Sequence, residues 1–293
     1  MMKKVLITGI DSFTGKHLCK HLSSSGYDVY GTSLLSKGEK IYICDITKKS
    51  DIVNILKKLE PDFLIHLSGI SFAAHGNNED FYKVNTIGSL NILDAFIELK
   101  LKPMKIILAS SATVYGNQGL EVLDESLCPK PANHYGASKY AMESLAKNYF
   151  DKLPVIVTRP FNYTGIGQAE HFLIPKIVKH FRENKKTIEL GNLHVSREFN
   201  SVLYICEVYK RLLECSSTSE VVNIASNDGI KLLDVIKMMN EIAGYEINVE
   251  VNPAFVRKGE IKSLTGSNKK LLSMIGPLEQ QNLKQTIKDM YND

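Results

Sequence analysis

The stretch TGIDSFTG, residues 8–15, decides the fold expected of this chain. It follows a short apolar run at Lys4–Ile7 and opens a helical pattern over Gly15–Ser24. A turn between strand and helix with this spacing is typical of dinucleotide binding, because Gly9 permits the tight turn and Gly15 permits close helix packing. Ser12 stands where a further glycine is usual. We interpret the turn as functional, since a serine hydroxyl can donate to a phosphate oxygen.

The composition is that of an ordinary globular chain. Of its 293 residues 44% are hydrophobic and 23% charged, and the dispersed charges sum to only +4, which argues against a nucleic-acid partner. The five cysteines form neither CxxC pairs nor metal-like clusters, so we expect reduced thiols and no metal. No apolar run approaches the roughly 18 residues of a membrane span. The N-terminal apolar run is too short for a signal peptide. These features predict a cytoplasmic protein without a membrane partner.

Strand and helix patterns alternate through the first 160 residues. Such alternation predicts right-handed crossovers and a doubly wound parallel sheet of the Rossmann type, covered on both faces. Strands are expected at Lys4–Ile7, Asp28–Thr32, Lys40–Cys44, Phe63–Leu67, Lys105–Ala109 and Val155–Thr158. Helices are expected at Gly15–Ser24, Asp51–Leu59, Asp80–Leu99 and Lys139–Phe150.

The rhythm breaks after Pro160. Further elements are expected at Phe172–Asn184, Ser201–Glu214, Val221–Ile224, Leu232–Ala243 and Leu283–Tyr291. We therefore expect residues 1–160, with a return segment near 196–222, to form the NAD(P)-binding domain. The remaining parts of 161–293 would form a smaller α/β domain for the substrate.

The end of the second strand bears on the choice of cofactor. NAD-selective folds usually place an acid there, about 20 residues after the glycine turn. Here Ser33 holds the place and Lys37 follows, with no carboxylate to repel a 2′-phosphate. This favours NADP(H), and NAD(H) stays open. Asp45, after the third strand, fits either an adenine contact or a turn cap.

The motif with the clearest chemistry is Tyr135-Gly136-Ala137-Ser138-Lys139. Residues four apart share a helix face, so the phenol and the ammonium are neighbours. A free tyrosine has a pKa of about 10. A nearby cation and an oxidised nicotinamide both favour the phenolate, which predicts acid–base work by Tyr135. Upstream, SSATVYG at 110–116 ends an apolar strand, where hydroxyls lie at the mouth of the site.

Five stretches together resemble the extended short-chain dehydrogenase/reductase family. They are TGxxxFxG at 8–15, HLSG at 66–69, SSATVYG at 110–116, YGASK at 135–139 and RPFN at 159–162. The resemblance covers essentially the whole chain. It implies a Rossmann domain, a smaller C-terminal domain that holds a nucleotide-diphosphate sugar, and a homodimer formed through helices near 80–99 and 138–150.

The resemblance also implies roles for individual residues. Ser111 would hold the reacting oxygen of the sugar, Tyr135 would exchange the proton, and Lys139 would bind the nicotinamide ribose and depress the Tyr135 pKa. Asn85 matches the family's asparagine near the active-site helix. The expected cofactor-binding residues are Gly9, Ser12, Phe13, Thr14, Gly15, Ser33, Asp45, Ile46, Leu67, Ser68, Gly69, Asn85, Tyr135, Lys139 and Arg159.

Residues near the motif tyrosine, Tyr115, distinguish the branches of the family. Sugar 4,6-dehydratases carry a glutamate two places before it, often after an aspartate, whereas this chain has Ala112 and Thr113. Neither can protonate a leaving hydroxide. The fucose-synthase branch has a cysteine at the Thr113 position, which is also missing. What remains is hydride transfer at C4, by a ketoreductase or an epimerase.

The second half resembles reductases of GDP-4-keto-6-deoxy-D-mannose, through RPFNYTGIGQ at 159–168, GNLHVSREF at 191–199 and RKGE at 257–260. By that likeness Asn162 contacts the sugar or its phosphate. Arg197 and Arg257 clamp the diphosphate, which suits planar guanidinium groups. The family's RDFxDV is REFNSV here, and Ser12 replaces a glycine, so base and sugar stay open. The expected substrate-binding residues are Thr113, Asn162, Arg197, Arg257 and Glu260.

The function expected from these features is NADPH-dependent reduction of the C4 ketone of a nucleotide-linked 4-keto-6-deoxyhexose, with a GDP sugar favoured. One alternative is a UDP-hexose 4-epimerase with tightly bound NAD, against which the missing carboxylate at Ser33 argues. A second alternative is a sensor of sugar nucleotides that keeps the fold without catalysis. The intact set of Ser111, Tyr135 and Lys139 argues against a sensor.

Overall fold

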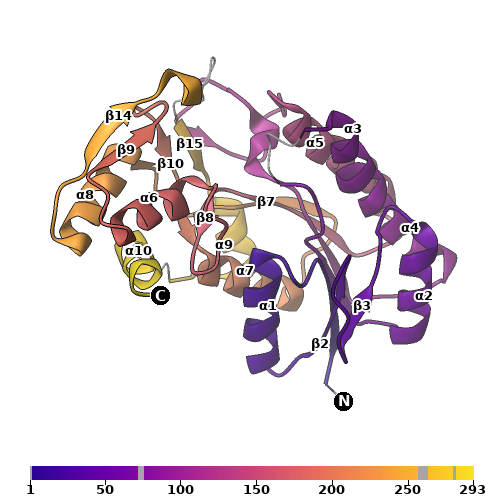
Figure 1. Ribbon diagram of the computed structural model, residues 1–293. Helices are drawn as coiled ribbons and strands as arrows, with labels where there is room; N and C mark the ends of the chain where they lie inside the picture. Colours follow the sequence, from indigo (N-terminus) through magenta and orange to yellow (C-terminus); the bar gives the residue numbers. More distant parts are fainter. Residues whose placement is uncertain (1, 72–75, 257–262, 280–281) are drawn as a thin grey trace.

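The computed structural model describes residues 2–71, 76–256, 263–279 and 282–293. Its main feature is a parallel sheet of seven strands in the order β3-β2-β1-β4-β5-β7-β12 (Figure 1). The strands are β1 (Lys4–Thr8), β2 (Asp28–Ser33), β3 (Ile41–Ile43), β4 (Phe63–His66), β5 (Lys105–Ala109), β7 (Val155–Pro160) and β12 (Glu220–Ile224). The strand order reverses beside β1, which is where doubly wound sheets bind their ligands.

Each face of this sheet is covered because successive strand side chains point to opposite sides. Val5 and Ile7 of β1 pack toward the core that holds α1 (Phe13–Ser24) and α7 (Val202–Glu214). Leu6, between them, packs into the other core. That core is covered by α2 (Lys49–Leu59), α4 (Ser89–Glu98) and α5 (His134–Ala146). Figure 1 shows the two helical layers on either side of the sheet.

The smaller part of the molecule lies beyond the β7 side of the sheet in Figure 1. Its strands pair as β13-β10-β15-β6, β11-β8 and β14-β9. They comprise β6 (Val122–Leu123), β8 (Tyr163–Thr164), β9 (Thr187–Leu190), β10 (Ser196–Arg197), β11 (Asn200–Ser201), β13 (Ile230–Lys231), β14 (Asn248–Val251) and β15 (Ser263–Gly266). Helices α6 (Leu173–Arg182), α8 (Leu232–Ala243) and α10 (Leu283–Asn292) enclose a separate apolar core.

The structure confirms the predicted Rossmann-type class and the six early strands, with ends that differ by two residues at most. Two helices differ most from the prediction. Helix α5 begins at His134 and not at Lys139, because the Asn133 side chain caps it by accepting from the Gly136 amide at 2.8 Å. The predicted helix over Asp80–Leu99 contains a π-helical turn, η1 (Phe81–Gly88), before α4.

Among the described ranges, no helix has the length and apolar character needed to cross a membrane.

Candidate active site

Two glycines close the first turn against the ends of β1 and β4. Gly9 has φ +70°, and a β-carbon there would lie 3.0 Å from the Ser68 amide nitrogen. A β-carbon on Gly15 would lie 2.3 Å from the Gly9 carbonyl oxygen. Both positions therefore exclude side chains, as the sequence predicted for a tight turn and a closely packed helix.

The residues between these glycines start helix α1. Ser12 is its N-cap, and its hydroxyl oxygen accepts from the Gly15 amide at 3.1 Å. The hydroxyl hydrogen is left to donate to another group, such as a phosphate oxygen at the positive end of the helix. Phe13 stacks on Tyr163 with ring centroids 6.1 Å apart, and Thr14 hydrogen-bonds the Tyr163 hydroxyl at 2.8 Å. The segment after β7 thus holds the start of α1.

A carboxylate lies at the end of β2, although no residue of β2 or of the segment directly after it supplies one. The Ser33 hydroxyl donates to Asp11 Oδ2 at 2.5 Å and accepts from the amides of Leu35 and Ser36. Asp11 belongs to the first turn, 22 residues earlier in the chain. The sequence favoured NADP(H) because no carboxylate was expected at the end of β2. The structure places the Asp11 carboxylate there. Lys37, the other part of that argument, lines a cavity of about 340 Å³ with residues of β3 and α2.

The loop after β3 holds Asp45 as a turn cap. Its Oδ1 accepts from the amide and the hydroxyl of Thr47, and these bonds lower the pKa of the Asp45 carboxyl. Ile46 is buried against Gly88, and its carbonyl accepts from Asn91 at 2.9 Å. Asp45 is therefore a turn cap, and its predicted contact with adenine stays a prediction.

A buried histidine connects three elements of the site. His66, at the end of β4, lies 2.6 Å from the Thr8 hydroxyl through Nδ1 and 2.8 Å from the Ser89 hydroxyl through Nε2. Ser89 donates its own hydrogen to the Asn85 carbonyl, so it accepts from Nε2–H, and Thr8 donates to Nδ1. Burial, helped by the nearby Lys139 cation, lowers the pKa of His66 to about 3, so the ring stays neutral.

The loop after His66 runs beside helix α5. Asn85 accepts from the Ile70 amide at 2.8 Å and donates to the Ile70 carbonyl and the Ser138 hydroxyl. Gly69 packs so closely that a β-carbon would lie 2.8 Å from Asn85 Oδ1 and 3.3 Å from Lys139 Nζ. The segment Leu67-Ser68-Gly69 is thereby brought to the predicted catalytic lysine.

The structure brings Ser111, Tyr135 and Lys139 together. Tyr135 and Lys139 lie one turn apart on α5, the Ser111 side chain lies near enough to Tyr135 to lower the pKa of its phenol, and Lys139 Nζ donates to the Ala109 carbonyl at 2.7 Å. Burial raises the pKa of Tyr135, and the Ser111 hydrogen bond opposes this rise. Burial lowers the pKa of Lys139 to about 8. The depressed tyrosine pKa that the sequence predicted is therefore not produced by the protein alone.

The Ser111 hydroxyl is oriented by Thr113. Ser111 Oγ accepts from the Thr113 amide at 3.2 Å and from the Thr113 hydroxyl at 2.9 Å. A hydroxyl oxygen has two acceptor sites, so both are filled and its hydrogen points elsewhere. Tyr135 lies near this hydroxyl, which lowers the pKa of its phenol. Ser111 is thus arranged as a donor toward the phenol and toward any oxygen bound beside it.

Arg159 is buried and paired with a carboxylate of α5. Its Nε and Nη2 donate to the Glu143 carboxylate at 3.0 and 2.6 Å, and its guanidinium lies over the Tyr115 ring. Ser110 donates to the same carboxylate, which also faces Lys139 and favours its charged form. The expected cofactor role of Arg159 stays a prediction beside these contacts. Sequence reasoning missed Glu143, although Tyr135, Lys139 and Glu143 follow one another at four-residue spacing on one helix face.

Of the expected substrate residues, Thr113 lies after β5 and the others belong to the second half of the chain. Arg197 lies in β10, with Nη1 donating to the Ser196 carbonyl at 2.8 Å, and the Asn162 carbonyl accepts from the Asn200 amide. Arg257 and Glu260 lie outside the described residues. In the part of the chain that the structure describes, no group of three or more His, Cys, Asp or Glu residues is placed to hold a metal ion.

Sequence reasoning also missed the function of Glu198 in the REF motif. This fully buried carboxylate accepts hydrogen bonds from the Asn200 side chain, the Ser226 amide and hydroxyl, and the amides of Asn227 and Gly266. Burial raises its pKa and these donors oppose the rise. Glu198 therefore joins β11, β15 and the segment after β12.

Known proteins are similar to this chain over nearly its whole length. The family profile described as GDP-mannose 4,6 dehydratase matches residues 6–290. A GDP-6-deoxy-D-talose 4-dehydrogenase of Aggregatibacter actinomycetemcomitans is 35% identical over 93% of this chain and 91% of its own length. A GDP-6-deoxy-D-mannose reductase of Pseudomonas aeruginosa is 28% identical over 100% of this chain and 97% of its own.

Two solved structures superpose closely. A candidate epimerase from Burkholderia cenocepacia has a TM-score of 0.94 and 37% identity, over 99% of this chain and 97% of that one. The protein RMD of Pseudomonas aeruginosa, complexed with NADPH, has a TM-score of 0.88 and 26% identity, over 100% and 97%. The chain belongs to the extended short-chain dehydrogenase/reductase family of nucleotide-sugar enzymes, and the family profile that it matches carries the description GDP-mannose 4,6 dehydratase.

We predict that His66 makes the protein sensitive to acid. Its pKa of about 3 in the fold is below the ordinary 6.5, so the unfolded chain binds a proton that the folded chain excludes. Stability is full above the unfolded pKa and falls as the pH drops below it, by roughly 2 kcal/mol through this group near pH 5. Urea unfolding at pH 7.5 and pH 5 measures the loss.

The matched variants for this prediction are His66→Gln and His194→Gln. The first removes the titrating ring, and its stability should change less between the two pH values than that of the parent protein. The second removes an exposed imidazole and should retain the full loss. An equal loss in the parent and in His66→Gln would contradict the assignment.

Proposed function

We propose that the protein transfers hydride at C4 of a GDP-linked 4-keto-6-deoxyhexose, reducing the ketone with a nicotinamide dinucleotide. The observation that carries the proposal is the convergence of Ser111, Tyr135 and Lys139 beside the loop that follows β4. The two GDP-6-deoxyhexose oxidoreductases among the relatives support the substrate class. The RMD complex with NADPH supports a nicotinamide coenzyme.

In the proposed reaction the reduced coenzyme supplies the hydride. Ser111, with its hydrogen directed outward, donates to the C4 oxygen and stabilises its developing charge. Tyr135 protonates that oxygen. Its raised pKa keeps the phenol protonated at neutral pH, which suits an acid in the reducing direction. Lys139 is mostly charged below its pKa of about 8 and lies where it can hold the ribose.

Binding of the substrate is proposed to fall to the smaller part of the molecule. Asn162, Arg197, Arg257 and Glu260 would contact the sugar and the diphosphate. We also propose the division into residues 1–160 with a return segment, and a nucleotide-sugar domain from the rest of 161–293. In support, β12 pairs with β7 in the main sheet and α7 packs against α1.

The proposal excludes sugar dehydration despite the family's description. Ala112 and Thr113 supply no acid beside the reacting sugar, and the Thr113 hydroxyl is directed to Ser111. A nucleotide-sugar 4-epimerase is the second candidate, favoured by the candidate epimerase of high similarity. A non-catalytic sensor would have no use for the oriented Ser111 hydroxyl.

The function is tested by supplying the purified protein with GDP-, dTDP- and UDP-linked 4-keto-6-deoxyhexoses and both NADPH and NADH. We expect coenzyme oxidation with the GDP sugars and at least a 100-fold loss in Tyr135→Phe, whose ring cannot donate the proton. No oxidation with any ketosugar, together with interconversion of UDP-hexoses by protein-bound NAD, would establish the epimerase. Binding of a sugar nucleotide without turnover would establish the sensor.

We predict that Thr113 acts as a positioning residue for Ser111. Thr113→Val removes the hydroxyl that donates to Ser111 Oγ and keeps the size of the side chain. We expect kcat to fall about tenfold, because the Ser111 donor is no longer fixed, with KM changed less than threefold. Thr113→Ser restores the hydroxyl and should recover most of kcat. A rise in KM alone would instead indicate a substrate contact.

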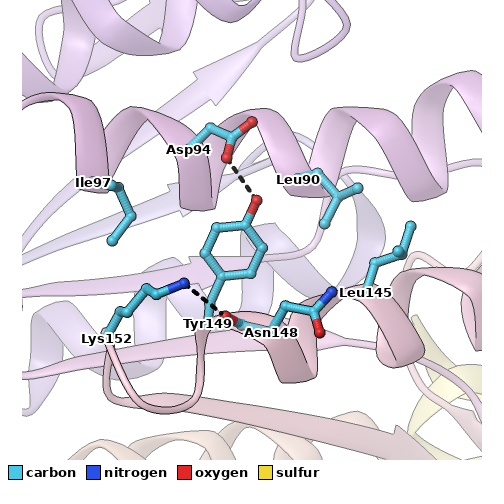
Figure 2. A pocket seen from close by; sticks show the side chains of 7 residues that line it. All are labelled: Leu90, Asp94, Ile97, Leu145, Asn148, Tyr149 and Lys152. Atoms are coloured by element: carbon cyan, nitrogen blue, oxygen red, sulfur yellow. Dashed lines mark hydrogen bonds between the residues drawn. The ribbon is translucent and has the colours of Figure 1, made fainter.

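A homodimer is proposed through the α4–α5 face shown in Figure 2. Leu90, Asp94 and Ile97 of α4 line a cavity of about 320 Å³ with Leu145, Asn148, Tyr149 and Lys152. Tyr149 crosses between the helices and donates to Asp94 at 2.6 Å. Ile97 and Leu145 are both exposed apolar side chains beside this cavity. A second copy would remove them from water.

We predict that Leu145→Glu weakens this dimer by placing a charge in an apolar contact. Light scattering after gel filtration should give about twice the chain mass for the parent protein and the single mass for the variant. Leu203→Glu is the matched control, because Leu203 is also an exposed leucine (50%, against 40% for Leu145) and lies on α7, on the opposite side of the sheet. A monomeric parent protein, or dissociation by both variants alike, would contradict the proposed face.

A further inference from the structure

We propose that Asp11, in the first turn, makes the protein prefer NAD(H) over NADP(H) by holding the adenosine ribose and repelling a 2′-phosphate. The inference rests on the nicotinamide coenzyme of the proposed function. It reverses the preference expected from the sequence. The residue that discriminates would come from the glycine turn and not from β2.

The first turn is held against the end of β2. The amides of Gly9 and Ile10 both donate to the Thr32 carbonyl, at 3.0 and 3.1 Å. The Ile10 side chain occupies the space over Gly31, where a β-carbon would lie 2.4 Å from it. These contacts fasten the turn to the end of β2, so the residue after Ile10 must emerge beside Ser33.

The hydrogen bonds of Ser33 fix the direction of its hydroxyl hydrogen. Its hydroxyl accepts from the Leu35 and Ser36 amides and donates to Asp11 Oδ2. With two acceptor sites filled, the hydrogen has one direction left, and Asp11 lies in it. Ser33 therefore fixes the Asp11 carboxylate and is itself unavailable as a donor to a phosphate.

A carboxylate at the end of β2 is suited to binding the adenosine ribose. In Rossmann folds the acid at the end of the second strand accepts from the ribose 2′-hydroxyl. Asp11 brings a carboxylate to that strand end from a different element. Its side chain is exposed, and the described residues provide no hydrogen-bond partner for Oδ1. That oxygen can accept from the 2′-hydroxyl of NAD.

The same carboxylate opposes NADP. A phosphate monoester carries about −1.5 to −2 charge near neutral pH. Within the described ranges, Asp11 forms no salt bridge with a cation that would offset its charge. Lys37, the cation nearest in sequence after β2, lines the cavity on the β3–α2 edge, and Lys40 is paired with Asp28. Like charges brought this close repel each other.

The experiment measures dissociation constants of NADH and NADPH by titration of nicotinamide fluorescence, without any sugar. We expect the parent protein to bind NADH at least tenfold more tightly than NADPH. In Asp11→Asn, which keeps the shape and removes the charge, NADPH should bind at least fivefold more tightly than to the parent. Raising the ionic strength should narrow the difference in the parent protein and not in Asp11→Asn.

Glu39→Gln is the matched control, because it removes one exposed carboxylate from the same segment after β2. It should leave the ratio of the two constants within twofold of the parent. Equal or tighter binding of NADPH by the parent, or an unchanged ratio in folded Asp11→Asn, would overturn the inference. Selective NADH binding without turnover of any ketosugar would uphold the role of Asp11 and defeat the proposed activity. Failure to bind either dinucleotide would defeat both.

Discussion

The close approach of the first turn to three neighbouring strand ends is the constraint on which the rest of the structure depends. A β-carbon on Gly15 would meet the Gly9 carbonyl at 2.3 Å, so the turn closes only because that side chain is missing. The turn then bonds to Thr32 of β2, while the Thr8 carbonyl accepts from Leu67 after β4. The start of α1 and the predicted catalytic helix consequently face the same edge of the sheet.

Local patterns were enough to predict most of the main sheet and the pair Tyr135 and Lys139. Strand and helix periodicity depends on residues a few places apart, and so does the spacing of that pair. The two-residue strands of the smaller part leave no such periodicity, because they are defined by their partners. Asp11 with Ser33, and Glu143 with Arg159, are side-chain pairs made only when distant segments meet. Sequence distance hid the first pair and led to the expectation of NADP(H).

Glu198 shows that a residue of a motif can hold the fold together, while its neighbours in the same motif are expected to bind the ligand. The family's acidic residue in RDFxDV is glutamate here, and its carboxylate accepts from the ends of three chain segments. Its neighbour Arg197 lies in the short strand β10, so the anchor fixes the place of the arginine. A longer acid in this position is accommodated because every donor around it comes from a backbone amide or a short side chain.

The hydrogen bonds through His66 all run in one direction. They begin at the Ser68 amide, pass through Thr8, the imidazole and Ser89, and end at the Asn85 carbonyl. A backbone amide cannot release a proton to this chain and a backbone carbonyl cannot take one away. The imidazole beside Lys139 is therefore held in one orientation, and this chain of hydrogen bonds does not conduct protons. Any proton that reaches Tyr135 must travel by a route that bypasses the only buried histidine of the described chain.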